Sequence, residues 1–322
     1  MTRTSADWVL GVDSGGSGLR VALAPVGGIE RALTTASPAP VRTSGSGIDP
    51  GHMVEQLVPM ARELIDRAGE VTLSGVALGA AGMATLGDGL RAELPGALAR
   101  ELGVERLALA ADGVTAYAGA LGQRRGAVVA AGTGMISLGT DLASWLRADG
   151  WGHLLGDCGG GSWIGQAGLD AAMRAFDGRR GGSKALLALA EERFGPAVEL
   201  PGLIYPRTDR PAALASFAPD VARCAADDPV AAGILRRAAG HIAEAAAAVC
   251  PADGGEVALT GGLFKTGEPL LGPLREELTT QLPRATVVTA TGDPLHGALV
   301  IASALATEGL RLPRDHRLLH VP

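Results

Sequence analysis

The chain has 322 residues, of which 47% are hydrophobic and 3% aromatic, and its formal net charge is −6. This length can bury a large core and suggests two domains. An acidic balance without a basic cluster argues against nucleic acid or an anionic membrane surface as the main partner. Neither a membrane-spanning apolar run nor a signal-peptide pattern is visible, so we expect a cytoplasmic protein.

The first pattern with chemical content lies close to the N-terminus. An apolar run ends in Asp13, a turn of glycine and serine follows, and a second apolar run begins at Leu19, which predicts strand, turn, strand. We expect Gly15, Gly16 and Gly18 to adopt positive φ and to bring backbone N–H groups close to a ligand. Taken alone, the pattern is more often an ordinary hairpin than a phosphate site.

Strands and helices alternate after this hairpin. Residues 37–50 are rich in Pro, Gly and Ser and predict a loop. The hydrophobic periodicity then predicts a helix over 50–68, a strand over 71–78, a helix over 89–102, a strand over 106–111 and a helix over 114–121. This alternation indicates a largely parallel sheet covered by helices.

Residues 127–138 repeat the opening plan of apolar strand, glycine turn and apolar strand. Because one hairpin is duplicated, the two turns could face each other across a cleft. Downstream we expect helices over 162–176, 183–194, 211–226 and 229–249, a strand closed by a third glycine turn over 257–264, a helix over 270–282, a strand over 286–290 and a helix over 295–308.

Three glycine turns at strand ends resemble the ATPase fold shared by sugar kinases, actin and Hsp70. The opening hairpin resembles its first phosphate loop, residues 131–134 the second, and residues 260–262 the adenosine turn. The resemblance implies an α/β protein with two actin-like ATPase (ribonuclease H-like) domains and a central cleft. The expected domains are residues 1–113 and 114–322, and the last helix could pack on either.

A longer block, Gly-Trp-Gly-His-Leu-Leu-Gly-Asp-Cys-Gly-Gly-Gly-Ser-Trp-Ile-Gly at residues 150–165, is more specific. It resembles the block found in N-acetylglucosamine kinases of the BadF/BadG/BcrA/BcrD ATPase family. Residues 292–298 also resemble the closing Pro-x-x-Gly-Ala element of that family. The resemblance covers nearly the whole chain, from residue 9 to about residue 304.

The resemblance implies ATP and Mg²⁺ as cofactors and assigns roles to individual residues. Asp13 would hold magnesium through water, Asp112 would be the catalytic base, and a sugar would be the small-molecule partner. The implied cofactor-binding residues are Asp13, Gly15, Gly16, Ser17, Gly132, Thr133, Gly134, Gly261 and Gly262. The implied sugar-binding residues are Ser46, Gly47, Asp112, Trp151, Gly152 and Asp157.

Two of these residues have ordinary structural alternatives. A lone aspartate such as Asp112 at a strand end is usually a turn former or a helix N-cap. A tryptophan such as Trp151 is more commonly a core residue. We favour the functional interpretation of both because the flanking motifs fall in the expected order, and because a pyranose offers hydroxyls to a carboxylate and an apolar face to an aromatic ring.

The chain departs from the family pattern at two positions. Cys158 stands where a glutamate usually follows Asp157, and the loop that often carries a Gly-Asn pair for the sugar reads Gly45-Ser46-Gly47-Ile48, without an asparagine. Serine has a shorter reach than asparagine and a different donor and acceptor set. A preference for an N-acetylated sugar is therefore less secure than kinase activity.

The sequence predicts an ATP-dependent kinase for the 6-hydroxyl of N-acetylglucosamine or a related hexosamine. Glucosamine, glucose and N-acetylmuramic acid are alternative substrates. An ATPase activator of a dehydratase is another class, although the three scattered cysteines give no iron-sulfur pattern. A non-catalytic sugar sensor is a third, for which only ten residues precede Gly11, too few for an N-terminal DNA-binding domain. Homodimer formation stays open.

Overall fold

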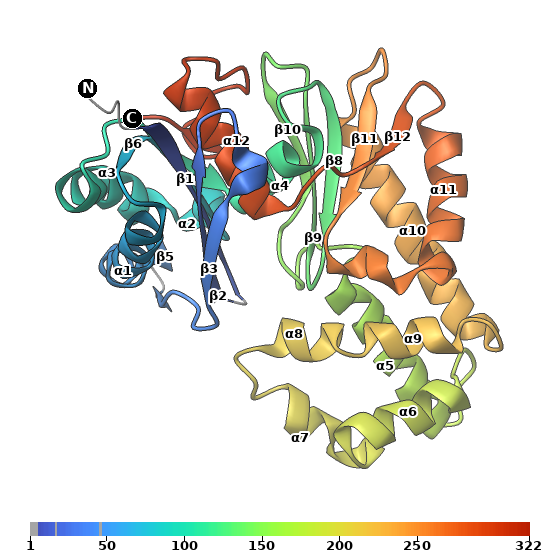
Figure 1. Ribbon diagram of the computed structural model, residues 1–322. Helices are drawn as coiled ribbons and strands as arrows, with labels where there is room; N and C mark the ends of the chain where they lie inside the picture. Colours follow the sequence, from blue (N-terminus) through green and yellow to red (C-terminus); the bar gives the residue numbers. More distant parts are fainter. Residues whose placement is uncertain (1–5, 17, 45–46) are drawn as a thin grey trace, which may run out of the picture. The chain divides into compact units, whose positions relative to one another are not determined.

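The computed structural model describes residues 6–16, 18–44 and 47–322, so Ser17 and Ser46 lie outside the described residues. It is an α/β protein with one six-stranded and one five-stranded sheet, which confirms the predicted fold class (Figure 1). The chain divides into two compact units. Unit 1 contains Met1–Gly126, Thr140–Trp145 and Thr289–Pro322, and unit 2 contains Ala127–Gly139 and Leu146–Val288.

The six-stranded sheet forms the centre of unit 1, in the order β13-β7-β6-β1-β2-β3. Its strands are β1 (Ala6–Gly15), β2 (Gly18–Pro25), β3 (Leu33–Ser37), β6 (Val71–Ala80), β7 (Leu107–Ala111) and β13 (Leu319–His320). The opening hairpin is antiparallel and pairs Asp13 with Arg20, whereas β1, β6 and β7 run parallel. The three parallel strands therefore end at one edge of the sheet.

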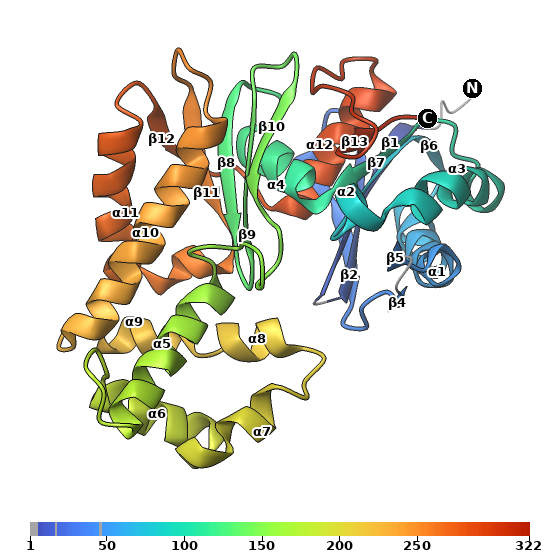
Figure 2. The same cartoon turned by 180° about the vertical axis from the view of Figure 1, so that it is seen from behind.

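Two pairs of helices cover the faces of this sheet (Figures 1 and 2). On one face lie α1 (Pro50–Ala68) and α3 (Asp88–Leu102), and on the other lie α4 (Asp112–Leu121) and α12 (Pro294–Ala306). Smaller elements complete the unit: η1 (Ile29–Arg31), β4 (Thr43–Ser44), β5 (Gly47–Ile48) and α2 (Met83–Leu86).

Glycine allows α4 and α12 to approach each other at backbone distance. A Cβ at Gly297 would lie 1.9 Å from the carbonyl oxygen of Thr115, and a Cβ at Gly119 would lie 2.1 Å from that of Asp293. No side chain fits at these separations. The helix whose position the sequence left open thus packs on α4, β1 and β6 of unit 1.

Unit 2 is built on the sheet β10-β9-β8-β11-β12. Its strands are β8 (Gly126–Ala131), β9 (Met135–Thr140), β10 (Trp145–Asp149), β11 (Glu256–Thr260) and β12 (Thr286–Thr289). Apolar residues of α10 (Pro229–Val249) and α11 (Glu268–Gln281) share one core with β8. The remaining helices are α5 (Gly161–Phe176), α6 (Lys184–Phe194), η2 (Ala197–Glu199), α7 (Leu200–Ile204), α8 (Arg210–Ala215), α9 (Ala218–Cys224) and η3 (Gly262–Thr266).

The structure differs from the sequence expectations in three places. The helix expected over 211–226 is interrupted between α8 and α9, because Pro219 lacks the N–H that would continue the helix. The edge strands β3, β10 and β13 were not predicted. The contact-defined units also differ from a division at residues 113 and 114, since α4 and α12 pack together in unit 1.

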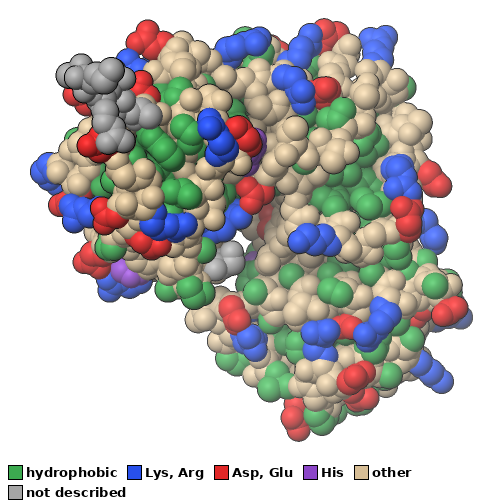
Figure 3. All heavy atoms as spheres, viewed as in Figure 1, with side chains coloured by type: hydrophobic (Ala, Val, Ile, Leu, Met, Phe, Trp, Pro, Cys, Tyr) green, Lys and Arg blue, Asp and Glu red, His purple; other side chains and the backbone are tan. Residues whose placement is uncertain are grey.

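Arginine and acidic side chains are interspersed on the described surface drawn in Figure 3, which shows no extended basic patch on that face. Among the described residues, no helix combines the length and the apolar character needed to cross a membrane.

Candidate functional site

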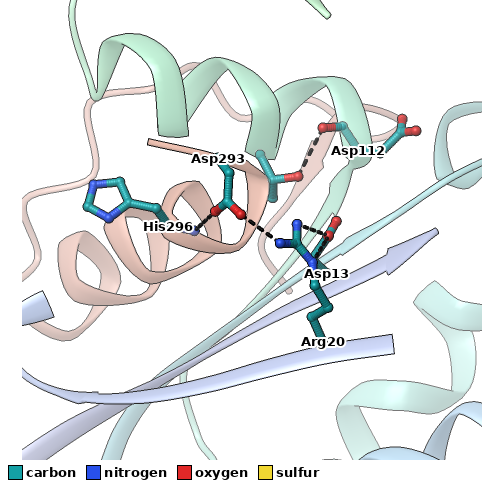
Figure 4. A network of polar contacts seen from close by, with 6 residues as sticks. Asp13, Arg20, Asp112, Asp293 and His296 are labelled. Atoms are coloured by element: carbon teal, nitrogen blue, oxygen red, sulfur yellow. Dashed lines mark hydrogen bonds and ion pairs between the residues drawn. The ribbon is translucent and has the colours of Figure 1, made fainter. Parts of the chain in front are cut away.

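An ion-pair network surrounds Asp13 at the end of β1 (Figure 4). Arg20, its cross-strand partner on β2, donates from Nε at 3.0 Å and from Nη2 at 2.6 Å to Asp13 Oδ2. The third nitrogen, Nη1, donates at 2.6 Å to Oδ2 of Asp293. Asp293 also caps α12, because its Oδ1 accepts the N–H of His296 at 3.0 Å. Arg20 therefore ties the first glycine turn to the start of α12.

The charges in this network reinforce one another. Partial burial acts to lower the pKa of Arg20, but its hydrogen bonds and charge interactions with both aspartates outweigh burial and raise that pKa. Burial likewise acts to raise the pKa of Asp293, and the His296 N–H and the Arg20 guanidinium outweigh it and lower the pKa. These contacts therefore favour the charged forms of Arg20 and Asp293.

The glycine turn beside Asp13 leaves open space. A Cβ at Gly15 or Gly16 would meet no atom within 4 Å, whereas a Cβ at Gly18 would lie 2.1 Å from the carbonyl oxygen of Ser37. Only Gly18 has a positive φ, of 125°, so the expectation of positive φ at Gly15 and Gly16 is wrong. Those two glycines provide room above the turn rather than an unusual backbone conformation.

Asp112 stands at the same edge of the sheet as Asp13. It follows β7 directly, and β6 lies between β7 and β1. Adjacent strands are about 4.8 Å apart, so the two strand ends are separated by about 10 Å. The carboxyl edge of parallel strands is where α/β proteins commonly bind ligands.

The local geometry of Asp112 is not that of a helix N-cap. Ala111 occupies the cap position of α4, and Asp112 is the first residue of the helix. Its Oδ1 accepts the N–H of the next residue, Gly113, at 2.9 Å, whereas a cap would accept from a residue two or three positions further along. The side chain is half-buried. Asp112 thus lies in the first turn of α4, where its carboxylate bonds one N–H of the helix start, and it does not occupy the N-cap position.

In unit 2, the second glycine turn rests on the beginning of α5. The carbonyl oxygens of Gly132 and Thr133 accept the N–H groups of Gly161 and Ser162, at 2.9 and 2.8 Å. The N–H of Gly132 is bonded to the carbonyl oxygen of Gly134, so this donor is not available to a phosphate. Gly132 and Thr133 are exposed, and a Cβ at Gly132 would meet nothing within 4 Å.

Asp157 joins this turn to the tryptophan block. Its Oδ1 accepts the N–H of Gly152 at 3.2 Å, and its carboxylate also accepts the N–H of Met135. A Cβ at Gly134 would lie 2.4 Å from Asp157 Oδ2. The structure thus brings together three residues that the sequence predicted separately: Gly134, Gly152 and Asp157.

Burial raises the pKa of Asp157, the nearby charge of Asp149 raises it further, and the two backbone hydrogen bonds only partly oppose the shift. Asp149 is a residue that sequence reasoning missed. Its carboxylate accepts the N–H of Asp157 at 2.5 Å and that of Cys158 at 2.9 Å, and its φ is 61°. Its position two residues before Trp151 was the one available signal.

Trp151 is not a core residue, so the structural alternative for this tryptophan is wrong. Its side chain is 60% exposed. The guanidinium carbon of Arg147 lies 4.2 Å from the ring centroid, which is a cation–π contact. Arg147 is itself anchored to the carbonyl oxygens of Asp149 and Gly150, at 3.1 and 2.5 Å. The exposed Trp151 ring, held in place by the hydrogen-bonded Arg147 side chain, can stack on a ligand.

The third glycine turn lies beside the second. Gly261 has a φ of 107°, and a Cβ there would lie 2.2 Å from the carbonyl oxygen of Ala131. Gly261 and Gly262 are both exposed, and Gly262 begins η3. The residues predicted for adenosine and for phosphate are therefore adjacent within unit 2.

The chemistry of Asp13 fits a magnesium ion. Asp13 Oδ1 has no hydrogen-bond partner among the described residues, and Asp13 precedes the open turn of Gly15 and Gly16 by two residues. Mg²⁺ prefers oxygen ligands and is usually bound by one or two carboxylates while it keeps several waters. Within residues 6–16, 18–44 and 47–322, no group of three or more His, Cys, Asp or Glu could form an all-protein metal site.

Burial and the charges of Asp149 and Asp157 raise the pKa of the Cys158 thiol, which disfavours a reactive thiolate.

Comparison with known proteins identifies relatives over most of this architecture. Over 201 residues, 59% of this chain, the sequence is 30% identical to an N-acetylmuramic acid/N-acetylglucosamine kinase of Clostridium acetobutylicum, and the match spans 65% of that relative's length. A solved structure from Chromobacterium violaceum, provisionally assigned as an N-acetylglucosamine kinase, has a TM-score of 0.74 and 28% identity, with 92% of this chain and 99% of that chain covered.

A ROK family glucokinase of Streptomyces griseus, solved with glucose and AMPPNP, has a TM-score of 0.56 and 18% identity, with 93% of this chain and 99% of that chain covered. At this identity the similarity shows the fold alone. The sequence profile of the BadF/BadG/BcrA/BcrD ATPase family matches residues 10–302, in agreement with the prediction from the sequence. The chain belongs to the BadF/BadG/BcrA/BcrD ATPase family.

Proposed function

We propose that this chain is an ATP-dependent kinase that transfers the γ-phosphoryl group of ATP to the 6-hydroxyl of N-acetylglucosamine or a related hexosamine. The observation that carries the proposal is the position of Asp157, which joins the tryptophan block to the second glycine turn through Gly152 and Gly134. A sugar on the block would thus lie next to phosphates on the turn. The kinase assignments of the two relatives at 28% and 30% identity support this proposal.

Asp112 is the proposed catalytic base. Phosphoryl transfer needs a carboxylate that orients the attacking hydroxyl and accepts its proton. Asp112 is half-buried at the carboxyl edge of the sheet, and its Oδ1 is fixed by the N–H of Gly113. This hydrogen bond holds the carboxylate in one orientation, which favours proton transfer from a bound hydroxyl.

Asp13 is the proposed ligand for Mg²⁺, through water. When bound, Mg²⁺ supplies neutralisation of the charge that develops on the phosphates. Arg20 fixes Asp13 Oδ2 with two hydrogen bonds, and Oδ1 has no hydrogen-bond partner among the described residues. The exposed turns at Thr133 and Gly261 would approach the phosphates and the adenosine, respectively.

Trp151 and Asp157 are the proposed contacts to the sugar. The exposed indole would support the apolar face of a pyranose, and the carboxylate would accept hydroxyl hydrogens. The preference for an N-acetylated sugar depends on residues that depart from the family pattern, Cys158 and Ser46, so glucosamine, glucose and N-acetylmuramic acid are the competing substrates.

A kinase that consumes ATP is expected in the cytoplasm.

A panel of these four sugars, monitored by ADP release with Mg-ATP, tests the proposal. We expect ADP release that depends on sugar, with the highest kcat/KM for an N-acetylated hexosamine. Equal ADP release without sugar would instead support an ATPase of the activator class. Sugar binding without any ADP release would support a sensor.

A further inference from the structure

A pocket of about 380 Å³ lies in unit 2 among α5, α7 and α8. It begins at His153, the residue that follows the proposed sugar contact Gly152, and it is lined elsewhere mainly by side chains of these helices. Its apolar walls are formed by Leu169, Met173, Leu200, Ile204 and Leu214. Ligand pockets commonly measure about 300–1,000 Å³, so this volume is large enough to admit a substituent of a bound sugar.

One unpaired positive charge lines this pocket. The carboxylate of Asp170 on its wall is bonded to Arg174 at 2.7 Å, and Asp209 is held by two hydrogen bonds from Arg207, at 2.7 and 2.8 Å. Arg210 forms no ion pair with any described residue, and its Nη2 donates to the carbonyl oxygen of Tyr205. The nearby carboxylates are thus neutralised by other arginines, and the charge of Arg210 is left for a ligand.

Two polar atoms of the pocket residues are also without partners. Nε2 of His153 and Nε of Arg210 are both buried, and neither has a hydrogen-bond partner among the described residues. Leaving such a group unsatisfied is unfavourable, and native structures contain few of them. Their occurrence in two residues of one pocket indicates a partner from outside the chain.

We propose that this pocket is a subsite for a carboxylate carried on a short alkyl substituent of the hexosamine substrate. The carboxylate would pair with Arg210, and the alkyl part would contact Leu200 and Ile204. The inference rests on the proposed kinase function, because it extends the sugar site past Gly152. It assigns to the chain a preference among hexosamines that the tryptophan block alone does not provide.

Steady-state kinetics with N-acetylglucosamine and N-acetylmuramic acid test the subsite, since the second sugar differs by a lactyl ether that bears a carboxylate. In Arg210→Gln we expect KM for N-acetylmuramic acid to rise about tenfold or more, as for loss of a charge-assisted hydrogen bond, and KM for N-acetylglucosamine to change less than about twofold. Arg210→Lys should recover part of the loss. Arg207→Gln, a neighbouring arginine already paired with Asp209, is the matched control and should change neither KM.

Hydrogen exchange of the wild-type protein provides a readout that needs no variant and no turnover. N-acetylmuramic acid should protect Leu200–Ile204 and Arg210–Ala215 more than N-acetylglucosamine does. Free lactate is tested as an additional ligand. If lactate alters the rate of N-acetylglucosamine phosphorylation in the wild type but not in Arg210→Gln, the pocket binds a free carboxylate, and the substituent proposal is overturned.

The outcomes separate the subsite from the kinase proposal. Equal effects of Arg210→Gln on both sugars, or equal protection of α7 and α8 by both, would overturn the subsite while kinase activity stands. Phosphorylation of neither sugar would overturn the proposed function instead, and the exchange experiment would still decide whether the pocket binds the acidic sugar.

Discussion

Asp293→Asn isolates the ion pair between Asp293 and Arg20 from the helix cap that the same residue provides. Asparagine keeps an oxygen that can accept the His296 N–H, and it is as good an N-cap as aspartate. The side chains of Arg20 and Asp293 are 40% and 52% exposed, so this is close to a surface pair. We expect Asp293→Asn to lower the free energy of unfolding by about 0.5 kcal/mol, and less at high salt.

Asp293→Ala is the comparison variant because it removes both interactions. Loss of a helix cap costs about 1 kcal/mol, so Asp293→Ala should lower the free energy of unfolding by about 1.5 kcal/mol in total. Only the ion-pair part, about one third of this loss, should depend on salt. Arg20→Gln should cost more, about 2 kcal/mol, because the Asp13 side chain is only 16% exposed and would lose its cation.

Urea denaturation, followed by circular dichroism at low and at high salt, measures these differences. Equal losses in Asp293→Asn and Asp293→Ala, or a loss in Asp293→Asn that is independent of salt, would refute the division into pair and cap. In the two Asp293 variants Arg20 can still contact Asp13, so KM for ATP in Asp293→Asn should stay within about twofold of the wild type.

Three further predictions concern the residues of unit 2. Because the pKa of Asp157 is raised above 3.8, KM for the sugar should rise on acidification at a higher pH than an ordinary aspartate would give, and Asp157→Asn should abolish that pH dependence. Because the pKa of Asp157 is raised in the folded protein, its protonation stabilises the fold fully below the pKa of the unfolded chain, and this stabilisation is lost as pH rises through the folded pKa. At neutral pH the pH-linked contribution is therefore absent, and Asp157→Asn should not lower the free energy of unfolding by removing it. Trp151→Ala should raise KM for the sugar about five- to tenfold with an almost unchanged free energy of unfolding, because the exposed ring contributes stacking rather than core packing; a large loss of stability would contradict this. Gly134→Ala should destabilise the protein, since its Cβ would lie 2.4 Å from Asp157 Oδ2, while Gly132→Ala should leave stability unchanged and raise KM for ATP; equal stability of the two variants would contradict the packing argument.

The elements that the sequence predicted well are those with a strong local signal. Both hairpins were predicted from an apolar run, a glycine turn and a second apolar run, and they are observed as β1–β2 and β8–β9. The edge strands β3 and β10 were missed because their residues are partly exposed and mixed in polarity, which weakens a period-two pattern. The break at Pro219 was visible in the sequence, but the apolar spacing on either side concealed it.

The site shows a similar division. Asp13 and Asp112 could be placed at strand ends from the sequence, because parallel strands share a carboxyl edge. The network through Arg20 and Asp293 spans 273 positions, so no local pattern could predict it. Asp149 and the pocket at Arg210 also depend on how distant helices and loops pack, and the same holds for the contact of α12 with α4.

The measurement that tests the central claim most directly is phosphorylation by Asp112→Asn, with the product identified by phosphorus NMR and nucleotide affinity measured by calorimetry. The wild type should form a hexosamine 6-phosphate from N-acetylglucosamine and Mg-ATP. The variant should bind the nucleotide with nearly unchanged affinity and lose at least about 100-fold in kcat, as expected for removal of a general base. Retained turnover would remove Asp112 from the mechanism, and absence of any phosphorylated sugar with the wild type would contradict the proposed function.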